Sequence, residues 1–180
     1  TGYSQSNPVT RIAALTTGSG SKLSFGTSNN YTSGITNTAM TIDSTGRVTM
    51  PSQPAFYAYE GSSQNSDSEY TVEFTAAATN VGSHYNTSTY RFTAPVAGTY
   101  FFSYGWMTNG ENSRSGIEKN GSLVGQAQYT SSASYSRAEA SAVITCAVND
   151  YIEVRNNVNS TAGESVMHGS FRYFVGHLIG

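Results

Sequence analysis

Hydrophobic and polar positions alternate along much of the second half of the chain, which is the pattern of half-buried β-strands. The alternation is clearest in YNTSTYRFTAPVAGTYFFSYGW, residues 85–106. We expect one strand that carries Tyr90 and Phe92, then a turn at Ala94–Gly98, because Pro removes a ladder donor and Gly permits tight turns. A second strand should follow this turn.

That second strand has large apolar side chains on both of its faces. One face carries Tyr100, Phe102, Tyr104 and Trp106, and the other carries Phe101, Ser103, Gly105 and Met107. A strand of this kind needs cover on both sides. The pattern therefore predicts a β-sandwich that also forms an oligomer.

The rest of the chain after Pro54 repeats the same alternation between clusters of Gly, Asn, Ser and Asp. The further predicted strand segments are PAFYAYE, YTVEFTAA, SGIEKNGSLVGQ, SRAEASAVITCAV, DYIEVRNNV and SFRYFVGHLI. Asn120-Gly121 is a strong hairpin signal. No helical periodicity of useful length occurs, so we expect an all-β sandwich.

The first fifty residues have a different texture. Residues 1–21 form a polar lead with one apolar patch at 12–15, and MTIDSTGRVTM, residues 40–50, predicts a small hairpin. An isolated hairpin is marginal in water, so it would need to pack against copies of itself. Pro51 and Pro54 mark a boundary. We expect an extended β-hairpin shaft over 1–50 and a globular head over 51–180.

Composition narrows the setting in which the chain works. Only 11% of residues are charged, against about 25% in typical soluble domains. A surface rich in Ser, Thr, Asn and Gly suits an extracellular or virion protein. The net charge of −2 offers no electrostatic footprint for nucleic acid or an anionic membrane, and no apolar run is long enough for insertion into one. The chain starts at Thr1 without a signal peptide, so we expect a fragment of a longer protein.

The sequence offers no catalytic constellation, so we expect no enzyme. His84, His168 and His177 lack metal-ligand spacing, and no GxSxG elbow occurs. The single cysteine, Cys146, lies in an apolar run and should be a buried, inert thiol.

Four acidic residues are close in sequence and form the nearest approach to a metal site. They are Glu60, Asp67, Glu69 and Glu73. We interpret them as an acidic, solvated loop. Their carboxylates could hold Ca²⁺, but no calcium-binding motif supports this, and we expect no cofactor.

Residues from Pro54 to Gly180 resemble the globular C1q/TNF-like domain family. The most specific piece is FTAPVAGTYFFSY, residues 92–104. The other matching pieces, in chain order, are Pro54-Ala55-Phe56 with Ala58, Val72-Glu73-Phe74, Asn80-Val81-Gly82 with Tyr85-Asn86, Lys119-Asn120-Gly121, Asn149-Asp150-Tyr151-Ile152 and Phe174-Val175-Gly176-His177-Leu178-Ile179.

The resemblance implies a jelly-roll sandwich that assembles as a compact homotrimer. Such heads usually end an elongated stalk and recognise partners through exposed loops. Asn149 stands where the family usually has Gly, a change that a turn tolerates.

Upstream of the head, the chain lacks the Gly-X-Y period of collagen. Instead, MTIDSTGRVTMP resembles the short repeats near the ends of bacteriophage tail fibres and other viral spikes. The two resemblances together predict the virion-borne tip of a phage tail fibre, joined to an upstream fibre shaft. Complement partners and calcium sites of animal C1q proteins are not carried over.

The leading functional hypothesis is a trimeric receptor-binding head that adheres to a host surface glycan or outer-membrane receptor. One alternative is a structural cap that only trimerises the fibre, without receptor contact. Another is a secreted, animal-type C1q-like ligand. A capsule-degrading tip would need a catalytic constellation, and the sequence supplies none.

Two polar loops are the candidate receptor contacts, because tyrosines beside small polar residues adapt to partners and stack on sugars. Their candidate residues are Tyr129, Ser131, Ser132 and Tyr135 in QYTSSASY, and Asn157 and Asn159 in the loop over 156–164. Candidates for the trimer interface or the core are Tyr100, Phe102, Tyr104, Phe171, Tyr173 and His177.

Overall fold

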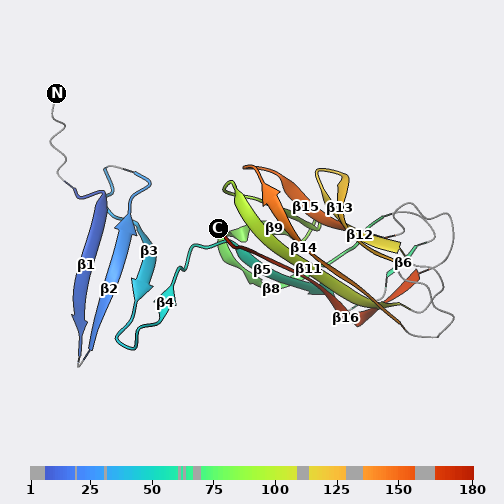
Figure 1. Ribbon diagram of the computed structural model, residues 1–180, viewed down its shortest axis with the longest axis horizontal. Coiled ribbons are helices and arrows are strands. Elements are labelled where there is room, and N and C mark those ends of the chain that lie inside the picture. The colour runs from blue at the N-terminus through green and yellow to red at the C-terminus, as the bar shows by residue number, and fades with distance from the viewer. Residues whose placement is uncertain are drawn as a thin grey trace. The chain divides into compact units, whose positions relative to one another are not determined.

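The structure is a computed structural model built from β-strands (Figure 1). It describes residues 7–18, 20–30, 32–60, 62, 64–66, 70–108, 114–128, 136–156 and 165–180. The chain divides into two compact units, Thr1–Gln53 and Pro54–Gly180. Over the described ranges the helical content is a single 3₁₀ turn, Val81–Ser83, and no helix there is long and apolar enough to cross a membrane.

The first unit is one antiparallel sheet whose four strands are neighbours in sequence order. Its strands are β1 (Thr10–Thr17), β2 (Gly20–Thr27), β3 (Asn37–Ile42) and β4 (Val48–Thr49). The predicted hairpin is confirmed, since β3 pairs with β4. Asp43 closes its turn, where Asp43 Oδ1 accepts hydrogen bonds from the backbone N–H groups of Thr45 at 2.9 Å and Arg47 at 3.0 Å.

The described part of the polar lead over residues 1–21 contains strands that the sequence did not predict. β1 and β2 pair along their whole length, from Thr10 opposite Thr27 to Thr17 opposite Gly20. Small alanines occupy the middle of β1, so its hydrophobic alternation is weak. Its threonines are β-branched and fit a pleated sheet well, although they count as polar. The predicted hairpin is thus half of a larger sheet.

The second unit is a sandwich of two antiparallel sheets. One, the β11 sheet, has the order β14-β11-β16-β5-β8, with β6 beside β16. The other, the β15 sheet, has the order β13-β12-β15-β10-β9, with β7 beside β15. The bounds are β5 (Ala55–Glu60), β6 (Gln64–Ser66), β7 (Tyr70–Thr71), β8 (Ala76–Asn80), β9 (Tyr85–Asn86), β10 (Arg91–Thr93), β11 (Gly98–Thr108), β12 (Arg114–Lys119), β13 (Ser122–Gln128), β14 (Ser136–Cys146), β15 (Tyr151–Asn156) and β16 (Ser165–Leu178).

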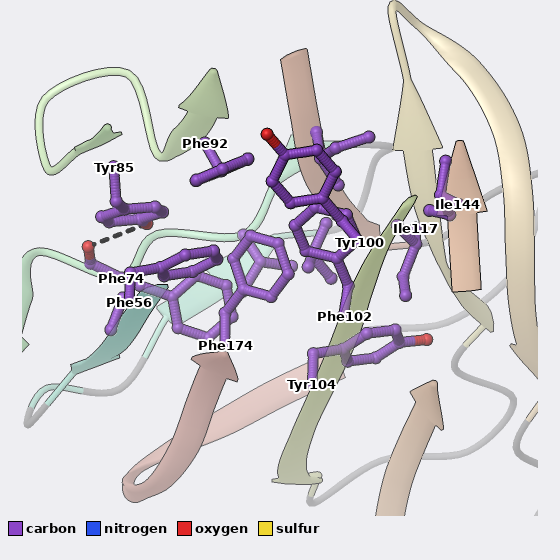
Figure 2. Close-up of a cluster of buried hydrophobic side chains, with 14 of the residues drawn as sticks. Phe56, Phe74, Tyr85, Phe92, Tyr100, Phe102, Tyr104, Ile117, Ile144 and Phe174 are labelled. Carbon is purple, nitrogen blue, oxygen red and sulfur yellow. Dashed lines mark hydrogen bonds between the residues drawn. The ribbon is translucent and has the colours of Figure 1, made fainter. Parts of the chain in front are cut away.

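Aromatic rings fill the space between the two sheets (Figure 2). The Phe56 ring stacks on Phe92, with centroids 5.1 Å apart, and meets Phe174 edge-on at 4.9 Å. The Tyr85 hydroxyl donates to the carbonyl oxygen of Phe74 at 3.1 Å, so its polar end is satisfied inside the core. Each fully buried ring contributes about 1.5–3 kcal/mol of hydrophobic stabilisation.

Two predicted strand segments are interrupted. YTVEFTAA is not one strand, because β7 pairs with β15 in one sheet while β8 pairs with β5 in the other. The chain crosses the core between them and buries Val72 and Phe74 completely. Tyr90 is not in a strand either: it has φ +61° in the turn between β9 and β10.

The predicted hairpin at Asn120-Gly121 is confirmed. Both residues have positive φ, as a two-residue turn between twisted strands requires, and β12 pairs with β13 on either side. Asn149 also has a positive φ, +69°. This backbone conformation explains why Gly suits the position and why Asn is tolerated there.

Candidate assembly face and recognition end

The outer side of the β11 sheet carries several exposed aromatic and aliphatic side chains among smaller polar ones, and we call this side the assembly face. Strand pairing arranges it in rows across β14, β11, β16 and β5. The first row contains Val143, Phe101 and His177, the second contains Ser141, Ser103, Val175 and Tyr57, and the third contains Glu139, Gly105, Tyr173 and Tyr59.

Several large side chains of the assembly face are exposed in the single chain. Tyr57 and Tyr59 are 43% and 40% exposed, Phe171 is 57% exposed and Val143 is 64% exposed. The rings of Tyr57 and Tyr59 stack with centroids 6.1 Å apart. Exposed aromatic patches of this kind mark interaction surfaces in soluble proteins.

On the assembly face the Tyr173 ring lies close against Gly105, and charged side chains lie at the β14 edge. A Cβ at Gly105 would lie 2.9 Å from Cε1 of Tyr173, so the absence of a side chain lets this ring lie down on the sheet. At the β14 edge, Arg137 donates to the Tyr173 hydroxyl at 3.4 Å and pairs with Glu139 at 2.6 Å. An apolar centre with a polar rim is the usual anatomy of a protein interface.

The six residues assigned to the core or the trimer interface separate into two groups. Tyr100, Phe102 and Tyr104 are fully buried within the single chain. The Tyr100 hydroxyl donates to Val96 O at 2.8 Å, and the Tyr104 hydroxyl shares a 2.8 Å hydrogen bond with Ser115 Oγ. Burial raises the pKa of Tyr100.

The other three, Phe171, Tyr173 and His177, belong to the assembly face. They alternate along β16 with the core residues Arg172, Phe174 and Gly176. The His177 ring lies 5.5 Å from that of Phe101, between centroids.

The two ends of the sandwich differ. Pro54 and Gly180 are at one end, where Pro54 O accepts from Leu178 N–H at 3.0 Å and Gly180 O accepts from Thr99 N–H at 2.6 Å. We call the other end the recognition end. The strand termini there, joined by the registers of both sheets, are Glu60, Ser66, Tyr70, Thr108, Arg114, Gln128, Ser136, Asn156 and Ser165.

The candidate receptor contacts lie outside the described residues. They are Tyr129, Ser131, Ser132, Tyr135, Asn157 and Asn159. The described residues that border them in sequence, Gln128 and Ser136, and Asn156 and Ser165, all lie at the recognition end.

A buried arginine supports the recognition end from inside the sandwich. The Arg172 guanidinium donates to Gln64 Oε1 at 2.9 Å and to Ser62 O at 3.0 Å, and Arg172 Nη2 lies 3.9 Å from Glu60 Oε2. Burial, which penalises the charged form, lowers the pKa of Arg172. Glu60 also accepts hydrogen bonds from Thr75 Oγ1 and from Ser62 N–H.

The interpretation of Glu60 as part of a solvated acidic loop is therefore wrong. Glu60 is the last residue of β5, and its carboxylate is buried beside Arg172. Asp67 and Glu69 lie outside the described residues.

Sequence reasoning also missed a charged cluster on the outer side of the β15 sheet. Glu118 and Glu153 face each other across β12 and β15, and both are buried. Arg91 donates to both carboxylate oxygens of Glu153 at 3.2 Å and lies over the Tyr151 ring, 4.1 Å from its centroid. Arg155 Nε is 3.9 Å from Glu118 Oε2. The signal was present in DYIEVRN, where charged side chains alternate with the core residues Ile152 and Val154.

No group of three or more His, Cys, Asp or Glu side chains among the described residues could hold a metal ion. Cys146 is buried, with its sulfur 3.9 Å from Ile144 O. Burial raises the pKa of this thiol, which keeps it protonated and unreactive.

Comparisons with solved structures bear on the fold of the second unit. The globular domain of zebrafish complement 1qA protein matches with a TM-score of 0.60 and 17% identity, over 71% of this chain and 98% of that chain. Eiger TNF from S. frugiperda matches with a TM-score of 0.56 and 10% identity, over 71% and 93%. Murine APRIL matches with a TM-score of 0.53 and 8% identity, over 71% and 99%. A search of curated protein sequences finds no match.

These likenesses confirm the predicted C1q/TNF-like jelly-roll fold of the head. The sequence model of the C1q domain matches residues 55–179, which is nearly the whole second unit. The chain therefore belongs to the C1q domain family.

Proposed function

We propose that this chain is a non-enzymatic, trimeric adhesion head at the end of a virion fibre, in particular a bacteriophage tail fibre. The head binds a host surface glycan or outer-membrane receptor through loops at its recognition end. The assembly face joins the three subunits. No cofactor takes part.

The assembly face supports the trimer. Its exposed aromatic residues would be a liability on a monomer, and closed three-fold symmetry covers such a surface on every subunit. Homotrimers are typical of C1q and TNF folds, which agrees with this arrangement.

The recognition proposal rests on the difference between the two ends of the sandwich. Pro54, where the polypeptide enters the head, lies beside the last strand, while the strand ends that border the candidate loops are at the opposite end. A head mounted through Pro54 thus presents its recognition end away from the mounting point. Loops supported by a rigid sandwich are common sites of binding.

The proposal of a viral fibre depends on what precedes the head. The described residues before Pro54 form an antiparallel β-sheet, and their sequence has no collagen-like repeat. This favours a β-structured fibre over the collagen stalk of an animal-type C1q ligand.

The test measures binding of the labelled full chain to a panel of bacterial strains and purified surface polysaccharides. The double variants Tyr129→Ala/Tyr135→Ala and Asn157→Ala/Asn159→Ala are compared with Val124→Ala, an exposed position on β13. If two stacking tyrosines each contribute about 1 kcal/mol, their loss should weaken binding at least tenfold.

Both loop variants should keep the mass of the parent in light scattering, and Val124→Ala should bind as the parent does. Unchanged binding by both loop variants would overturn the recognition proposal. Absence of binding to any bacterial surface would favour the structural cap, whose role is only to trimerise the fibre.

A further inference from the structure

We propose that the first unit is a second, separate trimerisation element, in which one face of its sheet packs against the same face of two other copies. This inference rests on the proposed trimer of the head. We call this surface the apolar face, and it consists of Ile12, Ala14, Leu23, Phe25, Met40, Ile42 and Val48.

The strand registers bring these residues together in two rows. Ile12 is opposite Phe25, which is opposite Met40, across β1, β2 and β3. The second row contains Ala14, Leu23, Ile42 and Val48 across all four strands. Side chains of directly paired residues point to the same side of a sheet, so both rows are on one face.

Within the described part of the first unit, no second layer lies over the apolar face. Ile12 is 72% exposed and Val48 is 54% exposed, while Phe25 and Met40 are only half-buried. All fully buried hydrophobic side chains of the described residues belong to the second unit. A single-layer sheet without a buried core is not expected to be stable in water.

The opposite face of the same sheet is partly covered by the chain itself. A Cβ at Gly26 would lie 2.7 Å from Cγ2 of Ile35, so the β2–β3 connection lies against this side. Ser24 and Gly26, both on this face, are buried. Among the described residues of the first unit, Ile35 therefore helps to cover one face, and the more apolar face stays exposed.

The charged side chains of the paired strands are on the partly covered face of the sheet. Arg11 and Lys22 are on the partly covered face, since they pair with Gly26 and Leu15. The apolar face carries no charged residue among its paired positions. Identical apolar faces can therefore meet without like-charge repulsion, which suits a symmetric assembly of one chain.

Covalent linkage makes a copy of this chain the expected occupant. The first unit joins the head directly at Gln53–Pro54, and Pro54 precedes β5, the strand that supplies Tyr57 and Tyr59 to the assembly face. A trimer built on that face tethers three first units to one another. Tethering gives each unit a high effective concentration of the other two.

The test uses single cysteines in the full chain with Cys146→Ala, which leaves no other thiol. Met40→Cys puts a thiol on the apolar face, and Thr41→Cys puts one on the opposite face of the same strand. Under mild oxidation, Met40→Cys should form disulfide-linked dimers at a yield that does not change on dilution, because the partners belong to one trimer. Thr41→Cys should form several-fold fewer, since disulfides need Cα atoms within about 7 Å.

Light scattering distinguishes a failure of this inference from a failure of the proposed head trimer. A trimeric mass with equal or negligible cross-linking of the two variants would overturn the inference and leave the head trimer intact. A monomeric mass of the parent would overturn both.

A second variant avoids dependence on one disulfide geometry. Phe25→Asp should expose the first unit to trypsin at Arg11, Lys22 and Arg47, while the chain keeps its trimeric mass through the head. Thr41→Asp serves as the matched control and should digest like the parent. Equal digestion of Phe25→Asp and the parent would also contradict the inference.

Discussion

The two units of this chain are both antiparallel β-structures, yet they bury their apolar side chains differently. In the head, two sheets face each other and enclose a core of aromatic rings. In the first unit, the described residues form one sheet whose apolar face has no second layer within that unit. The difference shows that strand pairing alone does not make a core, because a sheet also needs a second layer. In the head, a second sheet of the same chain forms that layer. In the first unit, we infer that neighbouring copies form it.

The largest expected contrast is between a ring in each unit. Phe102→Ala removes a fully buried ring that contacts Phe56, Phe92 and Phe174, so it should destabilise the head by about 3–5 kcal/mol. Phe25→Ala should leave the unfolding transition of the head unchanged. Denaturant unfolding followed by near-ultraviolet circular dichroism measures both. If Phe25→Ala destabilised the head as much as Phe102→Ala, the two units would not be energetically separate.

A second contrast concerns one charged residue in each unit. Arg172→Met leaves Glu60 buried without its arginine and should cost the head about 3 kcal/mol. Lys22→Met in the first unit should change stability by less than about 0.5 kcal/mol, because Lys22 forms no ion pair with a buried carboxylate among the described residues. Urea midpoints at neutral pH would compare them. Restoring stability with Glu60→Gln in the Arg172→Met background would identify the uncompensated carboxylate as the cause.

The assembly face tests whether the head, like the first unit, depends on its copies. Tyr59→Asp puts a charge among Tyr57, Tyr173 and the rest of this face, and it should raise the subunit dissociation constant more than tenfold. Sedimentation at a series of protein concentrations measures this dissociation constant. Val124→Asp on β13 is the matched control and should remain associated. Because the first unit is proposed to hold the copies together as well, the decisive variant is Tyr59→Asp/Phe25→Asp. If it stayed trimeric at all concentrations, this face would be excluded as the seam.

The smallest effect concerns one carboxylate in each unit. The pKa of Asp43 is lowered by hydrogen bonds from the Thr45 hydroxyl and from the backbone N–H and side chain of Arg47. The pKa of Asp150 is lowered by hydrogen bonds from the Asn120 side chain and the Ala147 N–H. Each carboxylate therefore stabilises its turn fully above the ordinary Asp pKa of about 4, and the contribution declines as the pH falls below it. Side-chain carboxyl chemical shifts between pH 6 and pH 2 would show both titrations. An Asp43 that titrates near pH 4 would contradict the turn geometry of the first unit.

The parts of the fold that sequence predicts well are those in which a local signal and the long-range structure agree. The residues of β11 alternate large side chains, and Asn120-Gly121 has the turn preference that its hairpin needs, so both were recognisable. β1 was not, because alanine and threonine occupy its strand positions. YTVEFTAA reads as one strand because both of its ends are strands, but only the tertiary structure shows that they belong to different sheets.

The residues of the candidate site also divide into those that the sequence pattern predicts and those that depend on long-range strand pairing. Alternation along SFRYFVGHLI is enough to put Phe171, Tyr173 and His177 on one face of β16. It does not reveal that Tyr57 and Tyr59 lie beside them, since that depends on β5 pairing with β16 over a separation of more than one hundred residues. The facing carboxylates Glu118 and Glu153 were hidden for the same reason.

The close approach of Pro54 to the last strand has a consequence for engineering. Because Leu178 N–H donates to Pro54 O, the first and last strands of the head are adjacent. A short linker could therefore join residue 180 to residue 54, as a circular permutant requires. A circular permutant opened at the Asn120-Gly121 hairpin would then keep every strand of both sheets. The same adjacency makes residues 54–180 suitable for insertion as a cassette into a surface loop of an unrelated carrier protein, with the recognition end displayed outward.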